Sequence, residues 1–190
     1  MQVVWYTAAS IDGRIADAGD SLAFLDTIGN VAGGEDEWRT FIESVDAILL
    51  GAGTQRWLVR EGYALPHRGL PIWLLTHDTE LVAAAAAADP AGTPVHHAQG
   101  DVARVLDGIA VAGHRRTWIG GGGDVAAQAL AADRVDEVIL TIAPTVLGAG
   151  PSIFDASDLP LRWFRLAECR PHGGDAARLR WVRDRRAATG

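Results

Sequence analysis

Residues 115–150 read RRTWIGGGGDVAAQALAADRVDEVILTIAPTVLGAG, and this stretch decides the fold. A short apolar strand that ends at Trp118-Ile119 runs into four consecutive glycines, and the chain restarts as an alanine-rich helix at Asp124. Glycines let a backbone approach a ligand closely, and a helix N-terminus offers unpaired N–H groups and a partial positive charge. The stretch therefore predicts a site for a phosphate-bearing nucleotide.

Apolar runs alternate with helical patterns on the N-terminal side of this stretch. Strands are predicted at 3–9, 46–50, 71–76, 94–98 and 116–119, and helices between them at 35–44, 55–60, 80–88 and 101–111. This alternation is typical of a parallel sheet with helices on both faces. Strand-like segments at 138–146, 162–169 and 177–184 follow, and the last two predict an antiparallel hairpin. We expect a single α/β domain over residues 1–190, with a mostly parallel mixed sheet.

The composition is that of an ordinary globular protein, with 48% hydrophobic and 22% charged residues among 190. The net charge of −7 argues against nucleic acid or an anionic membrane as a partner. No apolar run approaches the ~18 residues that cross a bilayer, and no secretory signal opens the chain, so we expect a cytoplasmic location. The single cysteine, Cys169, excludes an internal disulfide, and we expect a buried, inert thiol there.

A second glycine turn, Gly51-Ala52-Gly53-Thr54, follows the strand at 46–50 and opens a helix that Thr54 can cap. In a parallel sheet both glycine turns emerge at the same edge, where they are placed to clamp a pyrophosphate. Thr76-His77 opens on that edge too, and His77 is equally consistent with an exposed loop. The alternative for the glycines is a tight turn without a ligand. The first strand lacks the usual dinucleotide fingerprint, and a chain without lysine has no Walker loop.

Three carboxylates are candidates for a substrate cleft, namely Asp12, Glu35 and Asp36. Asp12 also suits a purely structural role, because an Asp-Gly turn is fixed by hydrogen bonds to its own backbone. Glu35 and Asp36 also suit the first turn of a helix, where acidic residues complement the helix dipole. The six histidines have no metal-ligand spacing, so we predict no metal site.

Several motifs resemble the dihydrofolate reductase-like family, which includes the reductase domain of the riboflavin-biosynthesis protein RibD. Residues 9–16, ASIDGRIA, resemble the family's S-L-D-G-x-I-A opening, and residues 51–54 resemble its G-x-G-T or G-R-x-T turn. Residues 120–123, 135–137 and 144–150 resemble its C-terminal signature of G-G-G, V-D-E and P-x-x-L-G-x-G. The motifs occur in the family's order and spacing, and they imply a dihydrofolate reductase-like fold.

The resemblance also implies NADPH as the cofactor. It puts the phosphates at the two glycine turns, the adenosine end near Thr76 and His77, and the nicotinamide near the first strand. The implied cofactor-binding residues are Ala8, Ala9, Ile15, Gly51, Gly53, Thr54, Thr76, His77, Gly120, Gly121, Gly122, Gly123 and Asp124. The implied reaction is hydride transfer to a C=N or C=O carbon, in which the protein mainly orients the two partners and excludes water.

The implied substrate is a ribosylaminopyrimidine or a pterin-like heterocycle. Glu35 or Asp36 would hydrogen-bond the heterocycle or relay a proton, and Asp12 would shape the loop beside it. The Pro-containing loop that precedes the acid in true dihydrofolate reductases is absent, so folate is not the expected substrate. The H-x-E and P-C-x-x-C motifs of the deaminase half of RibD are absent too, which predicts a stand-alone reductase.

Ala52 departs from the family pattern, because members with a G-R-x-T turn carry there an arginine that meets the cofactor's phosphates. Arg56 or Arg60, one or two helical turns on, would substitute for it. Relatives with this reductase domain pair up, so the resemblance implies a homodimer. Two alternatives remain open, a non-catalytic NADP-binding protein and a non-catalytic dimerising scaffold.

Overall fold

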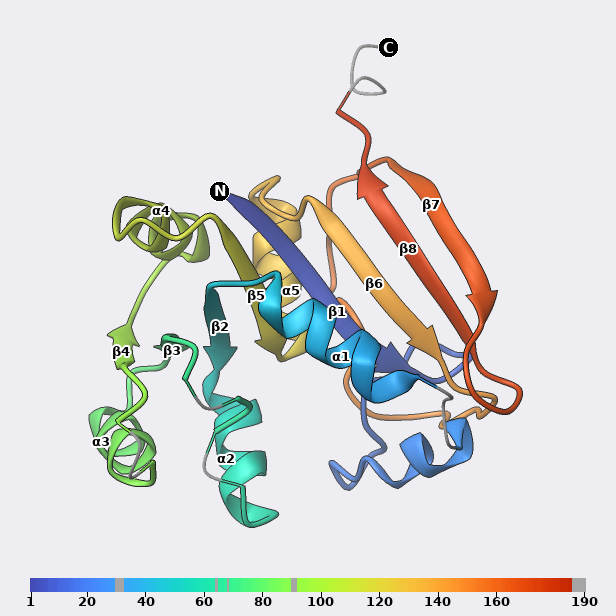
Figure 1. The fold of residues 1–190 in the computed structure, drawn as a ribbon, viewed down its shortest axis with the longest axis horizontal. Helices are drawn as coiled ribbons and strands as arrows, with labels where there is room; N and C mark the ends of the chain where they lie inside the picture. The colour runs from blue at the N-terminus through green and yellow to red at the C-terminus, as the bar shows by residue number, and fades with distance from the viewer. Residues whose placement is uncertain (30–32, 64, 68, 90–91, 186–190) are drawn as a thin grey trace.

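The computed structural model describes residues 1–29, 33–63, 65–67, 69–89 and 92–185, which form one eight-stranded sheet with helices packed against it (Figure 1). The strands are β1 (Gln2–Ala9), β2 (Ala47–Gly51), β3 (Ile72–Leu75), β4 (Val95–Ala98), β5 (Arg116–Gly121), β6 (Glu137–Ile142), β7 (Phe164–Pro171) and β8 (Ala177–Arg183). The helices are the 3₁₀ helix η1 (Ala23–Ile28), α1 (Gly34–Glu43), α2 (Ala52–Arg60), α3 (Thr79–Ala87), α4 (Val102–Val111) and α5 (Gly123–Ala131).

The strand order is β4-β3-β2-β5-β1-β6-β8-β7, and β1 lies near the centre between β5 and β6. The pairings from β4 to β6 are parallel, whereas β8 runs antiparallel to both β6 and β7. The predicted α/β fold, with its mostly parallel mixed sheet and C-terminal antiparallel hairpin, is therefore confirmed. Among the described residues, no helix is long and apolar enough to cross a membrane.

Two apolar layers sandwich the sheet, and β1 contributes to both. Val3 and Trp5 pack in the cluster that contains the buried faces of α4 and α5. Val4 packs on the opposite side, in the cluster that contains residues of α1, α2 and α3. Successive side chains of a strand alternate between faces, so a strand buried on both sides needs an uninterrupted apolar run. This is the physical reason that VVW stands at residues 3–5.

Helices α2 and α5 begin differently from α3 and α4. Asp78 and Asp101 cap α3 and α4, because their carboxylates accept from the backbone N–H groups of Leu81 and Arg104. The N-cap positions of α2 and α5 are Gly51 and Gly122, and no side chain caps either helix. The predicted cap by Thr54 is wrong, because α2 begins at Ala52 and Thr54 lies inside its first turn. The N-termini of α2 and α5 therefore keep their N–H groups free of capping side chains.

Cys169 lies on β7 and is exposed, so the prediction of a buried thiol is wrong. The reason is the position of β7 at the end of the strand order, where it pairs with β8 alone among the described strands. A cysteine in an apolar strand is buried only when another layer covers its face of the sheet. The sequence pattern does not reveal which strand lies at the edge.

The V-D-E motif at residues 135–137 holds the N-terminal ends of three strands together. The Asp136 carboxylate accepts from the Val3 backbone N–H at 2.8 Å, which fixes the start of β1 against β6. The Glu137 side chain is 1% exposed and accepts from Arg116 of β5 at 2.8 Å and from Arg180 of β8. A buried carboxylate is tolerated only when it is paired and hydrogen-bonded, so this motif is an ionic anchor of the sheet.

Replacing the anchor tests this role. Glu137→Ala leaves two arginines without their buried partner, and we expect it to lower the free energy of unfolding by about 3 kcal/mol. Asp107→Ala removes an exposed partner of Arg134, with 58% of the Asp107 side chain accessible, and should cost at most about 1 kcal/mol. Urea unfolding followed by circular dichroism measures both. Equal losses in the two variants would contradict the anchoring role.

Candidate functional site

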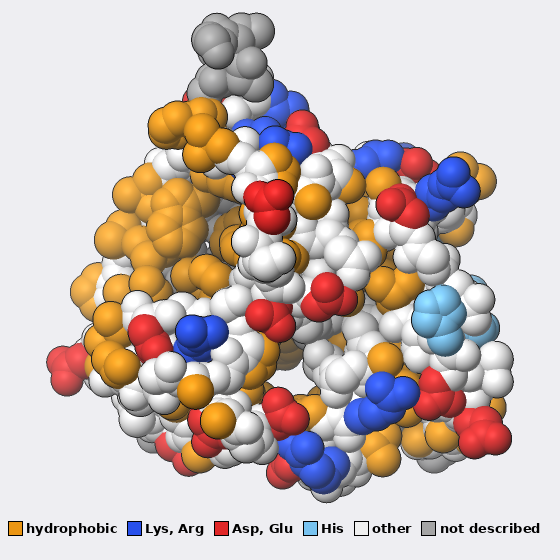
Figure 2. Space-filling model, turned by 180° about the vertical axis from the view of Figure 1, so that it is seen from behind, with side chains coloured by type: hydrophobic (Ala, Val, Ile, Leu, Met, Phe, Trp, Pro, Cys, Tyr) orange, Lys and Arg blue, Asp and Glu red, His pale blue; other side chains and the backbone are white. Residues whose placement is uncertain are grey.

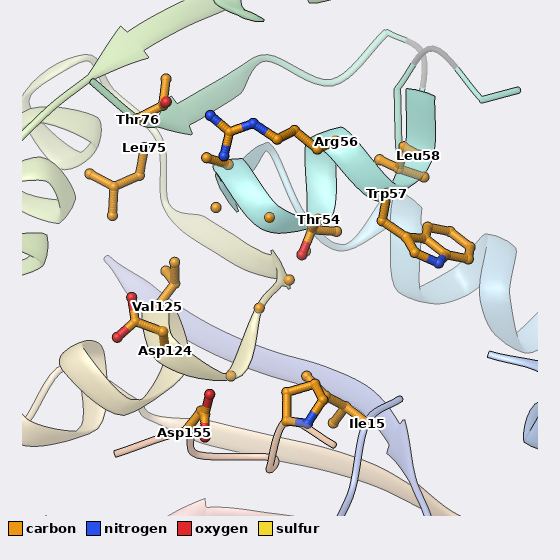
Figure 3. Close-up of a pocket in the computed structure, with 18 of the residues that line it drawn as sticks. Ile15, Thr54, Arg56, Trp57, Leu58, Leu75, Thr76, Asp124, Val125 and Asp155 are labelled. Atoms are coloured by element: carbon orange, nitrogen blue, oxygen red, sulfur yellow. The ribbon is translucent and has the colours of Figure 1, made fainter. Parts of the chain in front are cut away.

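A cavity of about 1310 Å³ lies at the carboxyl ends of the parallel strands (Figure 3). Its wall takes residues from the ends of β2, β3 and β5, from the first turns of α2 and α5, and from the loop after β1. Ligands of open α/β sheets bind at this edge, because strand ends and helix N-termini converge there. The location agrees with the site that the two glycine turns predict.

The two glycine turns adjoin each other. Leu50 of β2 pairs with Gly121 of β5 at the end of their shared ladder. A Cβ atom on Gly121, whose φ is +152°, would lie only 2.5 Å from the Thr54 hydroxyl oxygen. A Cβ atom on Gly51 would lie 3.5 Å from the Gly121 carbonyl oxygen. Any larger side chain at Gly121 would separate the turns, so these glycines let the N-termini of α2 and α5 meet at one cavity.

The two helix N-termini differ in charge. The first turn of α2 contains no acidic residue, whereas that of α5 contains Asp124, which is hydrogen-bonded to Gln128 at 2.8 Å. Among the described residues, the charged side chains that line the cavity are the carboxylates of Asp20, Asp78, Asp124 and Asp155 and the guanidinium groups of Arg56 and Arg60. The positive end of α2 is therefore the stronger attractor for an anion in an otherwise acidic cavity.

Most of the predicted cofactor-binding residues come together in this cavity. Those that line it are Ile15, Gly51, Gly53, Thr54, Thr76, His77, Gly120, Gly121, Gly122, Gly123 and Asp124. Ala8 and Ala9 do not; β1 contributes Trp5 and Thr7 instead. Ala9 is 1% exposed because it packs in the core beneath α5, and Ala8 points to the face opposite Thr7 because side chains alternate along a strand.

The three predicted catalytic carboxylates are not among the residues that line the cavity. Glu35 and Asp36 are exposed on the outer side of α1, where Asp36 pairs with Arg39 at 3.0 Å. Helical periodicity decides this outcome. Trp38 and Phe41 of α1 pack on Tyr6 of β1, and Glu37, four residues before Phe41, faces the hairpin, so this spacing of three and four residues could have identified the inward face.

Glu37 is the acid of α1 that faces inward, and it was not predicted. Its carboxylate lies 2.7 Å from Arg170 of β7, 3.1 Å from Arg178 of β8 and 3.7 Å from His172. Burial raises the pKa of Glu37, but the two guanidinium groups outweigh burial and lower it overall. Burial and the charge of Arg178 lower the pKa of His172. The cluster fastens α1 to the C-terminal hairpin.

Asp12 joins two loops outside the cavity. Its carboxylate accepts from the backbone N–H groups of Leu147 and Gly148, at 3.0 and 2.8 Å, and from the Ser10 hydroxyl at 2.7 Å. These bonds, led by the Leu147 N–H, lower the pKa of Asp12 to about 2. Asp12 itself does not line the cavity, but it positions the loop whose Ile15 does.

Hydrogen bonds also join the loop after β1 to α2 at the wall of the cavity. The Asp20 carbonyl accepts from the Trp57 indole N–H at 2.8 Å and from Arg60 at 3.3 Å. Trp57, which was not predicted, lies three residues before Arg60 on one face of α2, and this spacing is the local signal that could have identified it. Among the described residues, no group of three or more His, Cys, Asp or Glu residues could hold a metal ion.

Fold and cavity together define a dihydrofolate reductase-like α/β protein with a ligand cavity at its strand ends. The chain belongs to the RibD C-terminal domain family, whose model matches residues 59–177, more than half of its length. This is the family that the sequence motifs indicated, so the resemblance is confirmed. It is a family of riboflavin-biosynthesis reductase-like domains.

Individual relatives support the same fold. The chain is 25% identical over 160 residues to the uncharacterized protein YwjB of Bacillus subtilis (strain 168), covering 80% of this chain and 82% of that protein. A putative riboflavin biosynthesis protein from Shewanella sp. PV-4 superposes with a TM-score of 0.83 at 23% identity, covering 97% of this chain and 100% of the other. Dihydrofolate reductase from Enterococcus faecalis complexed with NADP(H) superposes with a TM-score of 0.59 at 17% identity, covering 96% of each chain.

The pKa of Asp12 gives a pH prediction. Its folded-state pKa of about 2 lies below the unfolded value of about 3.9. The carboxylate therefore stabilises the fold fully above about pH 4, and this contribution is lost as the pH falls through about 2. Asp12→Asn should lower the free energy of unfolding near neutral pH, and the two curves should converge at acid pH.

Urea unfolding of wild type and Asp12→Asn over a range of pH measures this convergence. Asp107→Asn controls for the loss of one negative charge. A difference between wild type and Asp12→Asn that stays constant down to about pH 2 would contradict the assigned role of the carboxylate.

Proposed function

We propose that the protein is an NADPH-dependent reductase that transfers hydride to a ribosylaminopyrimidine or a pterin-like heterocycle. The observation that carries the proposal is the meeting of two glycine turns and two uncapped helix N-termini at a single cavity. Membership in the RibD C-terminal domain family supports it. The similarity in fold to a dihydrofolate reductase complexed with NADP(H) supports the choice of cofactor.

The residues of the cavity fit a dinucleotide. A Cβ atom on Gly53 would meet no other atom within 4 Å, so a phosphate can approach the first turn of α2 closely there. The N–H groups of that turn have no capping side chain to compete with a phosphate. The volume of about 1310 Å³ exceeds the roughly 300–1,000 Å³ of ordinary small-molecule pockets. It is sufficient for a dinucleotide and a second small molecule.

Bound in this cavity, NADPH would supply a hydride to a C=N or C=O carbon of the substrate. The chain's own residues would orient the partners and exclude water. The N-terminus of α2 would hold the diphosphate, and Trp5 and Ile15 would form part of an apolar wall. The hydrogen bonds of Trp57 and Arg60 to the Asp20 carbonyl would keep the loop after β1 against α2. Holding reacting groups in place in this way contributes a large part of a rate enhancement.

A glycine-to-alanine pair tests the cofactor site. Gly53→Ala and Gly108→Ala both add a methyl group to a helix at a position with no other atom within 4 Å. Each should raise the free energy of unfolding by up to about 1 kcal/mol. Only Gly53→Ala should weaken NADPH binding, by about tenfold, because its methyl group obstructs the phosphate. Fluorescence quenching of Trp5 and Trp57, which line the cavity, measures binding.

Wild-type protein that fails to bind NADPH at about 1 mM would contradict the proposal. Oxidation of NADPH in the presence of a ribosylaminopyrimidine or a pterin would separate the reductase from a non-catalytic NADP-binding protein.

Assembly as a homodimer is part of the proposal, and the hairpin offers the surface. Leu166 and Cys169 of β7 lie opposite Trp181 and Leu179 of β8, so these four side chains share one face. Leu166 is 50% exposed and Cys169 is exposed. Figure 2 shows apolar side chains gathered on this side of the molecule. An exposed apolar patch on an edge strand is typical of a contact between protein chains.

A charge on this face tests the dimer. Leu166→Glu should convert a dimer to a monomer, because a carboxylate buried in an apolar interface lacks a partner. Val111→Glu is the matched control, since Val111 is 90% exposed on α4. Light scattering coupled to size-exclusion chromatography measures the mass of each variant. A wild-type protein that is monomeric, or a Leu166→Glu variant that stays dimeric, would contradict this surface.

A further inference from the structure

Arg56 and Asp78 form an ion pair on the wall of the cavity, where the Arg56 guanidinium lies 3.1 Å from the Asp78 carboxylate. Arg56 is on α2, one turn beyond the glycine turn of β2, and Asp78 follows β3 as the cap of α3. Figure 3 shows the Arg56 side chain extending from α2 toward the side of the cavity where Thr76 lies. The pair therefore bridges the ends of two neighbouring strands beside the proposed diphosphate site.

The two partners differ in how firmly they are held. One carboxylate oxygen of Asp78 accepts from the Leu81 backbone N–H at 3.0 Å, and the Asp78 N–H donates to the Thr76 hydroxyl at 3.0 Å. The Arg56 side chain is 57% exposed and the Asp78 side chain is 39% exposed. Exposed ion pairs contribute little stability, so an anionic ligand can draw the guanidinium away from its partner at small cost. Asp78, which also caps α3, is therefore the more firmly held member of the pair.

NADPH and NADH differ only at the 2′ position of the adenosine ribose. An arginine recognises the 2′-phosphate of NADPH, whereas a carboxylate accepts from the 2′-hydroxyl of NADH. Among the described residues that line the cavity, the arginines are Arg56 and Arg60. Arg60 is paired with Glu61 at 3.1 Å and donates to the Asp20 carbonyl, on the side of the loop after β1. Arg56 is left as the cation for a phosphate beside β3.

We propose that the Arg56–Asp78 pair sets the choice between the two dinucleotides, and that the cavity accepts both. Arg56 takes the 2′-phosphate of NADPH, and Asp78 takes a ribose hydroxyl of NADH. The inference rests on the proposed function and deepens it by naming the residues that discriminate. Among the described residues along the wall, four carboxylates stand against two guanidinium groups, and Arg56 is the one beside β3 that is placed to neutralise the added 2′-phosphate.

Two substitutions test the pair in opposite directions, with dissociation constants of NADPH and NADH measured for each by fluorescence quenching. Arg56→Gln should weaken the binding of NADPH about tenfold and leave the binding of NADH unchanged, because one charge-assisted contact with the 2′-phosphate is lost. Asp78→Asn should tighten NADPH several-fold and weaken NADH. Asparagine also caps helices well, so α3 keeps its N-terminus. Arg39→Gln is the matched control, since Arg39 is about as exposed as Arg56 and pairs with an aspartate outside the cavity.

Competition by adenosine 2′,5′-bisphosphate and by 5′-AMP isolates the contact from the nicotinamide end. Arg56→Gln should weaken the bisphosphate alone. If Arg56→Gln affects NADPH and NADH equally, or affects neither, the inference is overturned while the proposed function stands. If the wild type binds neither dinucleotide, the proposed function falls and the inference falls with it. Melting temperatures of the unliganded variants, compared with Arg39→Gln, show that the fold is intact.

Discussion

The close approach of two backbones at the end of the β2–β5 ladder is the constraint on which the cavity depends. Gly51 and Gly121 face each other there, and Thr54 packs where a side chain on Gly121 would be. Gly120 is subject to the same steric constraint, because a Cβ atom on it would lie 2.8 Å from the Ile48 side chain. With larger residues the two strands would separate, and the first turns of α2 and α5 would no longer open onto one space. The glycines matter here for lack of volume more than for flexibility.

Ionic anchors hold the frame around this opening. Glu137 ties β5, β6 and β8 at their ends away from the cavity, and Glu37 ties α1 to the hairpin. Both carboxylates lie among arginines on elements that are distant in the chain. The parallel strands position the cavity. The hairpin, held by these ion pairs, extends the sheet beyond β6. The Glu137 anchor thus lies at the end of these strands opposite the cavity, whereas the Glu37 cluster contacts β8 where it pairs with the carboxyl end of β6.

The charge of the cavity shapes what the chain can bind. A dinucleotide is an anion, yet carboxylates outnumber guanidinium groups among the described residues of the wall. In the proposed site, affinity for a phosphate would therefore come from directed groups, namely the N–H groups of the first turn of α2 and the side chain of Arg56. The family relationship establishes a reductase-like domain, and these local groups are where this chain departs from the G-R-x-T pattern, because Ala52 stands in the position of its arginine.

The sequence by itself determined the order of strands and helices, the two glycine turns, the antiparallel hairpin and the family. These features are local, since an apolar period of two or 3.6 residues and a run of glycines can be recognised within a few residues. Eleven of the predicted cofactor-site residues line the cavity because strand ends in a parallel sheet share an edge.

Only the tertiary structure decided which polar groups meet. Asp12 bonds to Leu147 and Gly148, and Glu37 to Arg170 and Arg178, across more than a hundred residues of chain. The exposure of Cys169 likewise depends on β7 being an edge strand, which no local pattern encodes. Such contacts follow from how packed elements bring distant residues together, so they appear only once the whole sheet is assembled.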